Sequence, residues 1–208
     1  MKLVLPGPTE RAVFLGHTGA GKTFAIERFA SYVENAHYLD LKEEFQPKVP
    51  YTRTDSFSKA VKREGHVLIR PKMAERTRLW YDWYFRTMLR KRKKVVIIAD
   101  ETYLLGEMHH AKYPAGLSLL SVIGRSKQLP LWAGIQRPRF APTVLYAQAE
   151  HFYVWYLSPA DVAALRDWID PEALKAVANL SGDYGFVHVW QAKGGRQQWQ
   201  LYSALPAD

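Results

Sequence analysis

The sequence contains no cysteine. Disulfide bonds and thiolate metal sites are therefore excluded, and the composition suits a reducing compartment. The chain also lacks an uncharged apolar run of about eighteen residues, the length that a membrane-spanning helix needs. Its N-terminus, MKLVLPGPTE, has no apolar segment followed by a small-residue cleavage site. We therefore expect a soluble, unsecreted, cytoplasmic protein without a transmembrane segment.

Acidic residues are in the minority, with 20 Asp and Glu against 29 Lys and Arg, which gives a formal net charge of +9. Such a charge favours polyanionic partners, because binding releases the counterions that surround a polyanion. Charge alone does not identify the polyanion. With 48% hydrophobic residues the chain can bury a core, and 208 residues lie within the range of one α/β domain.

Short apolar runs alternate with longer segments of helical period. This pattern is typical of an α/β fold with a mainly parallel central sheet flanked by helices. Before Pro138, apolar runs predict buried strands at residues 12–15, 37–41, 66–69, 95–99 and 131–135. Helices are predicted at residues 22–32, 74–92 and 115–126. The polar segment 46–59 contains two prolines and is predicted to be a loop.

The pattern changes beyond Pro138. It predicts a short helix at residues 143–148, a strand at 151–156, and helices at 161–168 and 171–180. A C-terminal β-hairpin is predicted from strands at 184–190 and 197–202. Its turn, Lys193-Gly194-Gly195-Arg196, contains glycines that can adopt the positive φ of a tight hairpin.

A phosphate-binding motif follows the first predicted strand. The sequence GHTGAGKT matches GxxxxGK[ST] and stands directly before a predicted helix, as the P-loop (Walker A) motif requires. Its glycines allow backbone amides to point at phosphate oxygens, and the helix N-terminus adds partial positive charge. Lys22 is expected to reach the β- and γ-phosphates of ATP, and Thr23 to bind Mg²⁺. The predicted nucleotide-binding residues are Gly16, His17, Thr18, Gly19, Ala20, Gly21, Lys22 and Thr23.

Two acids end the apolar run KVVIIADE, a Walker B pattern. In an α/β sheet they lie at the carboxyl edge, where ligands bind. Asp100 is predicted to hold Mg²⁺ through water, and Glu101 to polarise the water that attacks the γ-phosphate. Kinases do not need this second acid. We further expect the strand at residues 66–69 to lie in the sheet between the P-loop strand and the Walker B strand, an order found in ATPases with an added strand.

The segment GRSKQLPLWAGIQRP, residues 124–138, resembles the FtsK/HerA superfamily of DNA-pumping ATPases, which have a Gly-Arg element, an apolar strand and then Gln-Arg-Pro. The resemblance covers about residues 10–160, including YLDLK at 38–42. Because the chain is too short for the accessory domains of cellular pumps, it is most similar to the compact genome-packaging ATPases of tailless, often membrane-containing, double-stranded DNA viruses.

The resemblance implies a RecA-like P-loop NTPase with an added catalytic-glutamate strand. It makes Gln136 a sensor of the γ-phosphate and Arg125 the arginine finger that reaches a neighbouring subunit's ATP, with Arg137 and Arg139 as weaker alternatives. Many relatives have a threonine before the glutamine, where this chain has Gly134-Ile135. The whole chain, 1–208, is expected to form one ATPase domain, with a core at 1–157 and appended helices and hairpin at 158–208.

The implied function is an ATP-hydrolysing motor that translocates double-stranded DNA, packaging a viral genome into a preformed capsid. Its implied partners are DNA, identical subunits in a hexameric ring, and a capsid or portal vertex protein. Its location is then the host cytoplasm or the virion. Lys112, Lys193 and Arg196 are candidate DNA contacts. The basic run at residues 90–94 is either a solvated helix end or an outer contact with DNA or capsid.

Two other functions remain open from the sequence. One is a small-molecule or nucleotide kinase, although no clear arginine-rich lid is visible. The other is a virion or secretion assembly module that uses nucleotide only as a switch. A metal site at His109-His110 is not favoured, since adjacent histidines without cysteine partners do not have the spacing of metal ligands.

Overall fold

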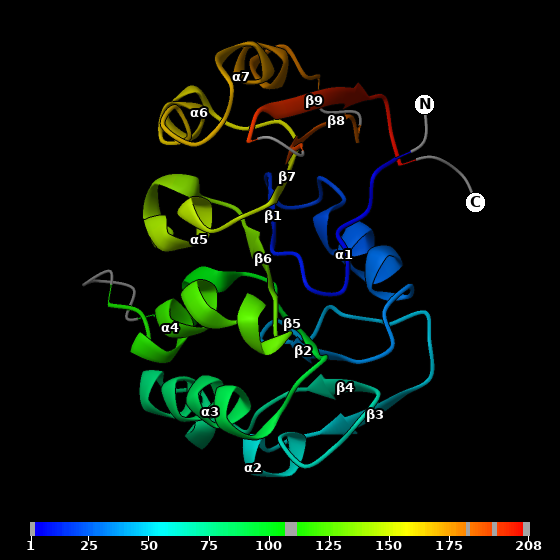
Figure 1. Ribbon diagram of the computed structural model, residues 1–208, viewed down its shortest axis with the longest axis vertical. Helices are drawn as coiled ribbons and strands as arrows, with labels where there is room; N and C mark the ends of the chain where they lie inside the picture. Colours follow the sequence, from blue (N-terminus) through cyan, green and yellow to red (C-terminus); the bar gives the residue numbers. More distant parts are fainter. Residues whose placement is uncertain (1–2, 107–111, 182–183, 193–194, 206–208) are drawn as a thin grey trace.

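Figure 1 shows the computed structural model of the protein, which describes residues 3–106, 112–181, 184–192 and 195–205. In this described part, nine strands form one sheet in the order β3-β4-β2-β5-β6-β1-β7-β8-β9. The strands β1 to β7 run parallel, and β8 and β9 are antiparallel to their neighbours. The mainly parallel sheet and the C-terminal hairpin are therefore confirmed. The strands are β1 (Ala12–Leu15), β2 (Ala36–Leu39), β3 (Tyr51–Thr54), β4 (His66–Ile69), β5 (Val96–Ala99), β6 (Leu131–Ile135), β7 (His151–Val154), β8 (Phe186–Gln191) and β9 (Gln197–Tyr202).

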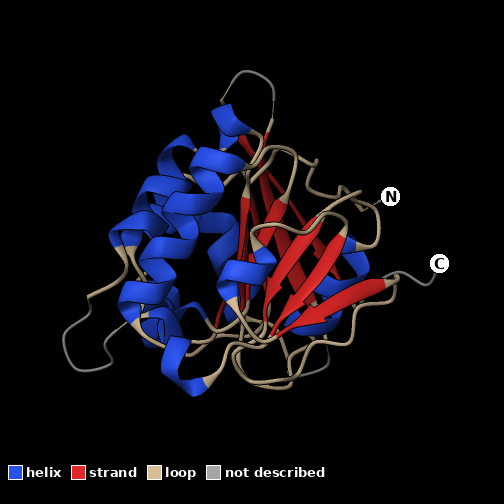
Figure 2. Ribbon diagram, turned by 90° about the horizontal axis from the view of Figure 1, so that it is seen from below, coloured by secondary structure: helices blue, strands red, loops and turns tan. Residues whose placement is uncertain are grey.

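Helices cover both faces of the sheet. In Figure 1, α1 lies against one face, while α3, α4 and α5 gather on the other, and Figure 2 shows helices on both sides of the sheet. None of the described helices is long and apolar enough to span a lipid bilayer. The α-helices are α1 (Lys22–Ala30), α2 (Phe57–Ala60), α3 (Arg78–Lys91), α4 (Ala115–Ile123), α5 (Thr143–Ala147), α6 (Pro159–Ala163) and α7 (Pro171–Ala178). Short 3₁₀ helices are η1 (Met73–Glu75), η2 (Thr102–Leu105), η3 (Arg125–Lys127) and η4 (Pro138–Phe140).

The two faces of the sheet bury separate cores, because successive side chains of a strand point to opposite faces. On β1, Val13 and Leu15 belong to the cluster that contains side chains of α3, α4 and α5, whereas Ala12 and Phe14 belong to the cluster that contains α1. Burial on both faces explains why β1 is apolar throughout. The four residues of β1 thus anchor helices on both sides while the loop after it stays at the sheet edge.

The predicted position of the strand at residues 66–69 is wrong. This strand, β4, lies between β3 and β2, and the strand between the P-loop strand β1 and the Walker B strand β5 is β6. The register of β6 fixes this order, since it pairs in parallel with both β1 and β5. Hydrophobic patterns identify a buried strand but do not specify its neighbours, which depend on long-range pairing.

The segment predicted as a loop, residues 46–59, contains β3 and the start of α2. Strand β3 is at the end of the sheet, pairs only with β4 in the described structure, and is partly exposed. An edge strand tolerates polar residues, so its sequence YTRT shows no apolar run. The β-branched threonines still favour an extended backbone.

Several predicted boundaries shift where a cap or a backbone angle ends the element. The helix predicted at 74–92 begins at Arg78, because the Thr77 side chain caps it by accepting from the Trp80 amide. The helix predicted at 115–126 ends at Ile123, after which Gly124 leads into η3. The helix predicted at 161–168 is the shorter α6. Strand β8 begins at Phe186, since Tyr184 has a φ of 48°.

Two histidines are buried within the sheet and its helix cover. His37 on β2 shares a 2.9 Å hydrogen bond between Nδ1 and the Tyr84 hydroxyl. His188 on β8 shares a 3.0 Å hydrogen bond between Nε2 and His151 Nδ1. Burial lowers the pKa of His37 to about 4. Burial, and then the neighbouring His151, lowers the pKa of His188 to about 3. Both imidazoles are therefore neutral in the folded protein near neutral pH.

These histidines predict a loss of stability in mild acid. Below about pH 6.5 an unfolded chain protonates them while the folded chain does not, so the free energy of unfolding falls as the pH falls toward 4. Each histidine contributes on the order of 1 kcal/mol per pH unit. Denaturant unfolding at pH 7 and pH 5 measures the effect. His37→Gln cannot titrate and keeps a hydrogen-bonding group for Tyr84, so it will lose less stability than the natural protein over this interval. Equal losses in both proteins would contradict this account.

Candidate nucleotide-binding and hydrolysis site

The predicted P-loop connects β1 to α1 at the carboxyl edge of the sheet. Gly19 and Gly21 have φ values of 77° and 99°, in the left-handed region that favours glycine. Gly21 is also the N-cap of α1 and provides no side-chain cap. The first amides of α1 therefore have no side-chain acceptor from their cap, as expected where a helix N-terminus receives an anion.

Lys22 is held inside this loop. Its side chain is only 4% exposed, and its Nζ donates a 2.9 Å hydrogen bond to the His17 carbonyl. Burial lowers the pKa of Lys22, while the nearby Asp100 and Glu101 carboxylates oppose that shift. The ammonium group thus lies between the phosphate loop and the two Walker B acids.

The two predicted Mg²⁺ ligands are in direct contact. Thr23 Oγ1 donates a 2.6 Å hydrogen bond to Asp100 Oδ2. Asp100 directly follows β5, and Thr23 is the second residue of α1. A hydroxyl and a carboxylate are the hard oxygen donors that Mg²⁺ prefers, and bound phosphates usually complete its coordination. The residues present therefore fit a Mg²⁺ ion held beside a triphosphate.

Glu101 is buried at the tip of the Walker B strand, with 3% exposure. Its backbone has a φ of 55°, a left-handed conformation that is costly for a residue with a side chain. Its Oε1 accepts hydrogen bonds from Lys42 Nζ, at 2.9 Å, and from Gln136 Nε2. Its Oε2 is buried and has no hydrogen-bond partner among the described residues. Burial raises the pKa of Glu101, and Lys42 opposes this effect.

Four neighbouring strands each contribute to this arrangement. In the order β2-β5-β6-β1, Lys42 follows β2, Asp100 and Glu101 follow β5, Gln136 follows β6, and the P-loop follows β1. The structure thus places Gln136 at the tip of the strand beside Walker B, where the resemblance put it. Lys42 was not predicted from the sequence to be a site residue. A lysine three residues beyond a buried strand was the available signal, but its meaning depends on β2 pairing with β5.

Gly134 on β6 has no room for a side chain. Any side chain at this position would clash with Asp100, because its Cβ would lie too close to the Oδ1 atom of that residue. Thr102 Oγ1 donates a 3.0 Å hydrogen bond to the Gly134 carbonyl. Strand β6 therefore contacts the Walker B turn through the backbone of Gly134. The Asp100 carboxylate occupies the space that a side chain at Gly134 would take.

Solved structures share this arrangement of strands and helices. The genome-packaging NTPase B204 of Sulfolobus turreted icosahedral virus 2, in complex with AMPPCP, matches with a TM-score of 0.77 at 15% identity, over 97% of this chain and 100% of that chain. B204, the DNA-packaging ATPase of Sulfolobus turreted icosahedral virus, matches with a TM-score of 0.70 at 16% identity, over 94% and 98% of the two chains. The chain has a P-loop ATPase fold.

VirB4 of Thermoanaerobacter pseudethanolicus shares this P-loop ATPase fold, with a TM-score of 0.64 at 10% identity over 95% of this chain and 92% of that chain. No protein-family model and no curated protein sequence matches the chain. At the level of fold, the neighbours agree with the resemblance to FtsK/HerA ATPases.

Arg125 lies at the opposite edge of the P-loop ATPase sheet from Glu101. Its Nη1 is 3.1 Å from Oε1 of Glu150, the residue directly before β7, and Glu150 also pairs with Arg11 directly before β1. Because β1 and β7 are parallel, these residues mark the amino edge, whereas the P-loop follows β1 at the carboxyl edge. Four strand residues, about 13 Å, separate the edges.

The two alternative arginines lie beyond Gln136. Arg137 Nη1 is 3.7 Å from Oδ2 of the fully buried Asp161, and the Arg139 guanidinium lies 4.5 Å from the centroid of the Phe140 ring. Neither of these contacts is with Glu101. Arg137 instead links the segment after β6 to α6.

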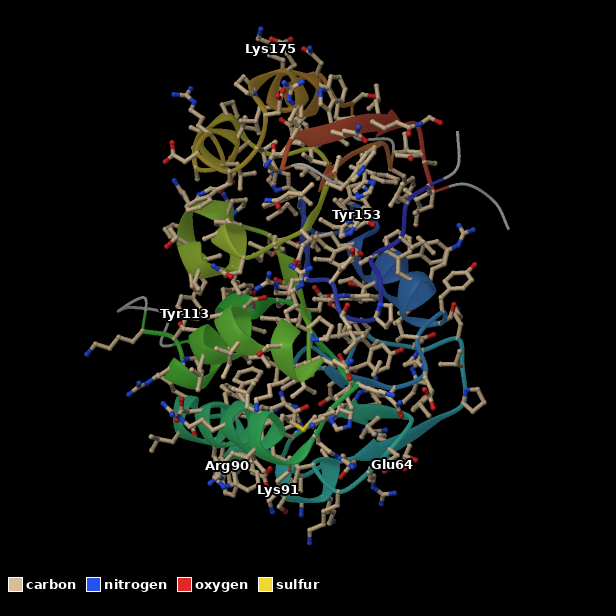
Figure 3. The ribbon with its side chains drawn as sticks, viewed as in Figure 1. Glu64, Arg90, Lys91, Tyr113, Tyr153 and Lys175 are labelled. Atoms are coloured by element: carbon tan, nitrogen blue, oxygen red, sulfur yellow. The ribbon has the colours of Figure 1, made fainter. Side chains whose placement is uncertain are left out.

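The candidate DNA contacts are exposed where the structure describes them. Lys112 lies just before α4, and Arg196 lies in the hairpin turn. Lys193 and the His109-His110 pair lie outside the described residues. Figure 3 labels Arg90 and Lys91 at the C-terminal end of α3. There they complement the helix dipole, and the chain then enters β5 at the amino edge.

The contact between Gly134 and Asp100 generates a test of the site. Gly134→Ala will displace the Asp100 carboxylate from Thr23, lower the free energy of unfolding by about 1–3 kcal/mol, and raise the Mg²⁺ concentration needed for nucleotide binding. Denaturant unfolding and nucleotide titrations over a range of Mg²⁺ concentrations measure both effects. Gly7→Ala is a control, since a Cβ there meets only the Glu10 side chain. An unchanged Mg²⁺ dependence in Gly134→Ala would show that Asp100 does not hold the metal.

Proposed function

We propose that this chain is an ATP-hydrolysing motor that translocates double-stranded DNA, and that it packages a viral genome into a preformed capsid. The observation that carries the proposal is the buried Glu101, whose Oε1 is occupied by Lys42 and Gln136 while Oε2 has no partner in the described structure. Glu101 directly follows Asp100, which accepts the hydrogen bond from Thr23. A carboxylate in this place supports hydrolysis, because it can orient a water toward the γ-phosphate.

The proposed roles of the chain's residues follow from their positions. The P-loop amides and the N-terminus of α1 hold the phosphates, and Lys22 exchanges its bond to the His17 carbonyl for β- and γ-phosphate oxygens. Thr23 and Asp100 would hold Mg²⁺, which would supply positive charge against the phosphates. Glu101 accepts a hydrogen bond from the attacking water, and Gln136, already bonded to Glu101, senses the γ-phosphate.

The likeness in fold to DNA-packaging ATPases extends over nearly the whole chain, which supports the DNA-motor proposal. The excess of nine basic residues supports an anionic partner. We propose that the chain acts as one ATPase domain, 1–208, that contacts DNA through Lys112, Lys193 and Arg196. We also propose that it docks on a capsid or portal vertex protein, in the host cytoplasm or the virion. The Walker B glutamate favours this function over a kinase, which does not need it.

A ring of subunits, for which we propose six, follows from the place of Arg125. It lies at the amino edge, so it is remote from its own P-loop and available to the P-loop of a neighbour. Its side chain is 63% exposed despite the ion pair with Glu150, and it must leave that pair to act as a finger. In a neighbour's site its guanidinium stabilises the charge that spreads over the transferred phosphoryl group.

Glu101→Gln tests the catalytic role. We expect ATP turnover to fall at least about 100-fold, because the amide is a poor base, while the affinity for ATP changes little. Phosphate release with and without double-stranded DNA, together with equilibrium ATP binding, provides the measurement. Glu64→Gln is the control, since Glu64 is exposed beside β4 in Figure 3. Full turnover in Glu101→Gln refutes the hydrolytic assignment. An ATP turnover rate of the natural protein that is the same with and without DNA refutes the motor function.

A mixing experiment tests the finger. Arg125→Ala should reduce turnover by roughly 1000-fold, the effect typical of an arginine finger. Glu101→Gln subunits retain Arg125, and Arg125→Ala subunits retain Glu101, so a mixed ring contains some complete sites. The mixture should therefore hydrolyse ATP faster than the sum of the rates that the two variants show separately. Arg166→Ala is the matched control, since Arg166 is also exposed and has no proposed role in the site. If mass measurements show mixed rings but turnover stays additive, Arg125 does not act between subunits.

A further inference from the structure

A cavity adjoins the P-loop on the side of β7 and β8. It is a cavity of about 260 Å³ between the loop and the C-terminal part of the chain. We call it the aromatic pocket. Its lining includes Ala20, Gly21 and Phe24 on one side and Trp155, Tyr184 and Leu205 on the other. The proposed chemistry at Glu101 uses none of the aromatic residues.

The order of strands gives the direction in which a bound nucleotide extends. Strand β1 has β6 on one side and β7 on the other, and the acids and Gln136 follow β5 and β6. If the γ-phosphate lies toward Glu101, the nucleoside leaves the loop toward β7 and β8. Trp155 directly follows β7, and Tyr184 stands just before β8, which is antiparallel to β7 and so begins at the same edge. The aromatic pocket therefore lies on the side of the P-loop toward which the nucleoside would extend.

The aromatic side chains of the pocket are placed in a way that packing of the protein does not explain. Tyr184 is 64% exposed and Phe24 is 53% exposed, although both are large and lie beside a buried core. Tyr184 also has a φ of 48°, a strained value for a residue with a side chain. Its ring approaches the helix N-terminus, since a Cβ on Gly21 would be 3.5 Å from Cδ1 of Tyr184. Trp155 is buried beneath the loop and forms a fixed wall.

We infer that the aromatic pocket is the site for the base of the nucleotide, with Tyr184 as the residue that stacks on it. The inference rests on the proposed function only in requiring that the P-loop bind a nucleoside triphosphate. Among the described lining side chains, polar atoms are limited to the Tyr184 hydroxyl and the Trp155 indole nitrogen. A base has a planar, polarisable face, so stacking on an exposed ring suits this lining. The C-terminal segment thereby contacts the same ligand as the P-loop.

Binding of two ligands that differ in the nucleoside tests the inference. Tyr184→Ala should weaken the binding of ATP by about 10-fold, because a base loses its stacking partner. Its affinity for inorganic tripolyphosphate, which has no base, should stay unchanged. Tyr184→Phe should restore ATP affinity, and Tyr184→Leu, which keeps apolar bulk without a ring, should not. Tyr32→Ala is the matched control, since Tyr32 is also 64% exposed but follows the C-terminus of α1.

The outcomes separate the base site from the phosphate site. An unchanged ATP affinity in Tyr184→Ala, or an equal loss for ATP and tripolyphosphate, overturns the base site. Full ATP affinity in Tyr184→Leu overturns the role of stacking. If Tyr184→Ala fails to fold, Tyr184→Leu still tests whether an aromatic ring is needed for ATP binding. Lys22→Ala should weaken the binding of both ATP and tripolyphosphate. If it weakens neither, the P-loop assignment fails, and the base site fails with it.

Discussion

The burial of the Glu101 carboxylate beside Lys42 and Gln136 is the interaction on which the rest of the site depends. An ionised carboxylate in a protein interior is costly unless cations or hydrogen-bond donors compensate it. Here both donors converge on Oε1, which fixes the orientation of the side chain. The left-handed backbone at Glu101 adds a second constraint, and Thr102 ties that turn to Gly134 on the next strand. The group proposed to act on water is thus held by three strands rather than by its own turn alone.

A parallel sheet makes this convergence possible and also sets its limits. The carboxyl ends of β2, β5, β6 and β1 meet at one edge, so side chains from remote parts of the sequence come within hydrogen-bond distance. The same geometry sends residues that precede the strands to the other edge. Glu150, Arg11 and Arg125 gather there around shared ion pairs. One subunit of the proposed ring therefore presents a nucleotide site on one edge and the exposed Arg125, paired with Glu150, on the other.

The C-terminal hairpin extends this edge beyond the P-loop. Strands β7, β8 and β9 continue the sheet past β1, and the start of β8 and the end of β9 return to the carboxyl edge. Stacked rings, including Tyr153 against Phe14 on β1 and against His188 on β8, join the hairpin to the core. Tyr184 is consequently supported by a rigid sheet although its own ring is exposed. A nucleotide bound between Tyr184 and the P-loop would connect the first and last parts of the chain.

The sequence by itself determined the features whose physical cause is local. The phosphate loop needs glycines, a lysine and a threonine at fixed positions within eight consecutive residues, and the Walker B acids need only an apolar strand before them. Gly16–Thr23, Asp100 and Glu101 could therefore be identified without coordinates. Gln136 required a resemblance as well. The α/β class and most strands follow from apolar runs, because burial on both faces demands them.

Only the tertiary structure decided which strands are neighbours, because their pairing depends on residues far apart in the chain. The strand between β5 and β1 is β6 and not the expected β4. The edge strand β3 could not be predicted from apolar runs, because its sequence is mostly polar. The tertiary structure also brought Lys42 to Glu101 and Tyr184 to the P-loop, across sequence separations that no local pattern records. Contacts of this kind depend on sheet order and register, which are properties of the whole fold.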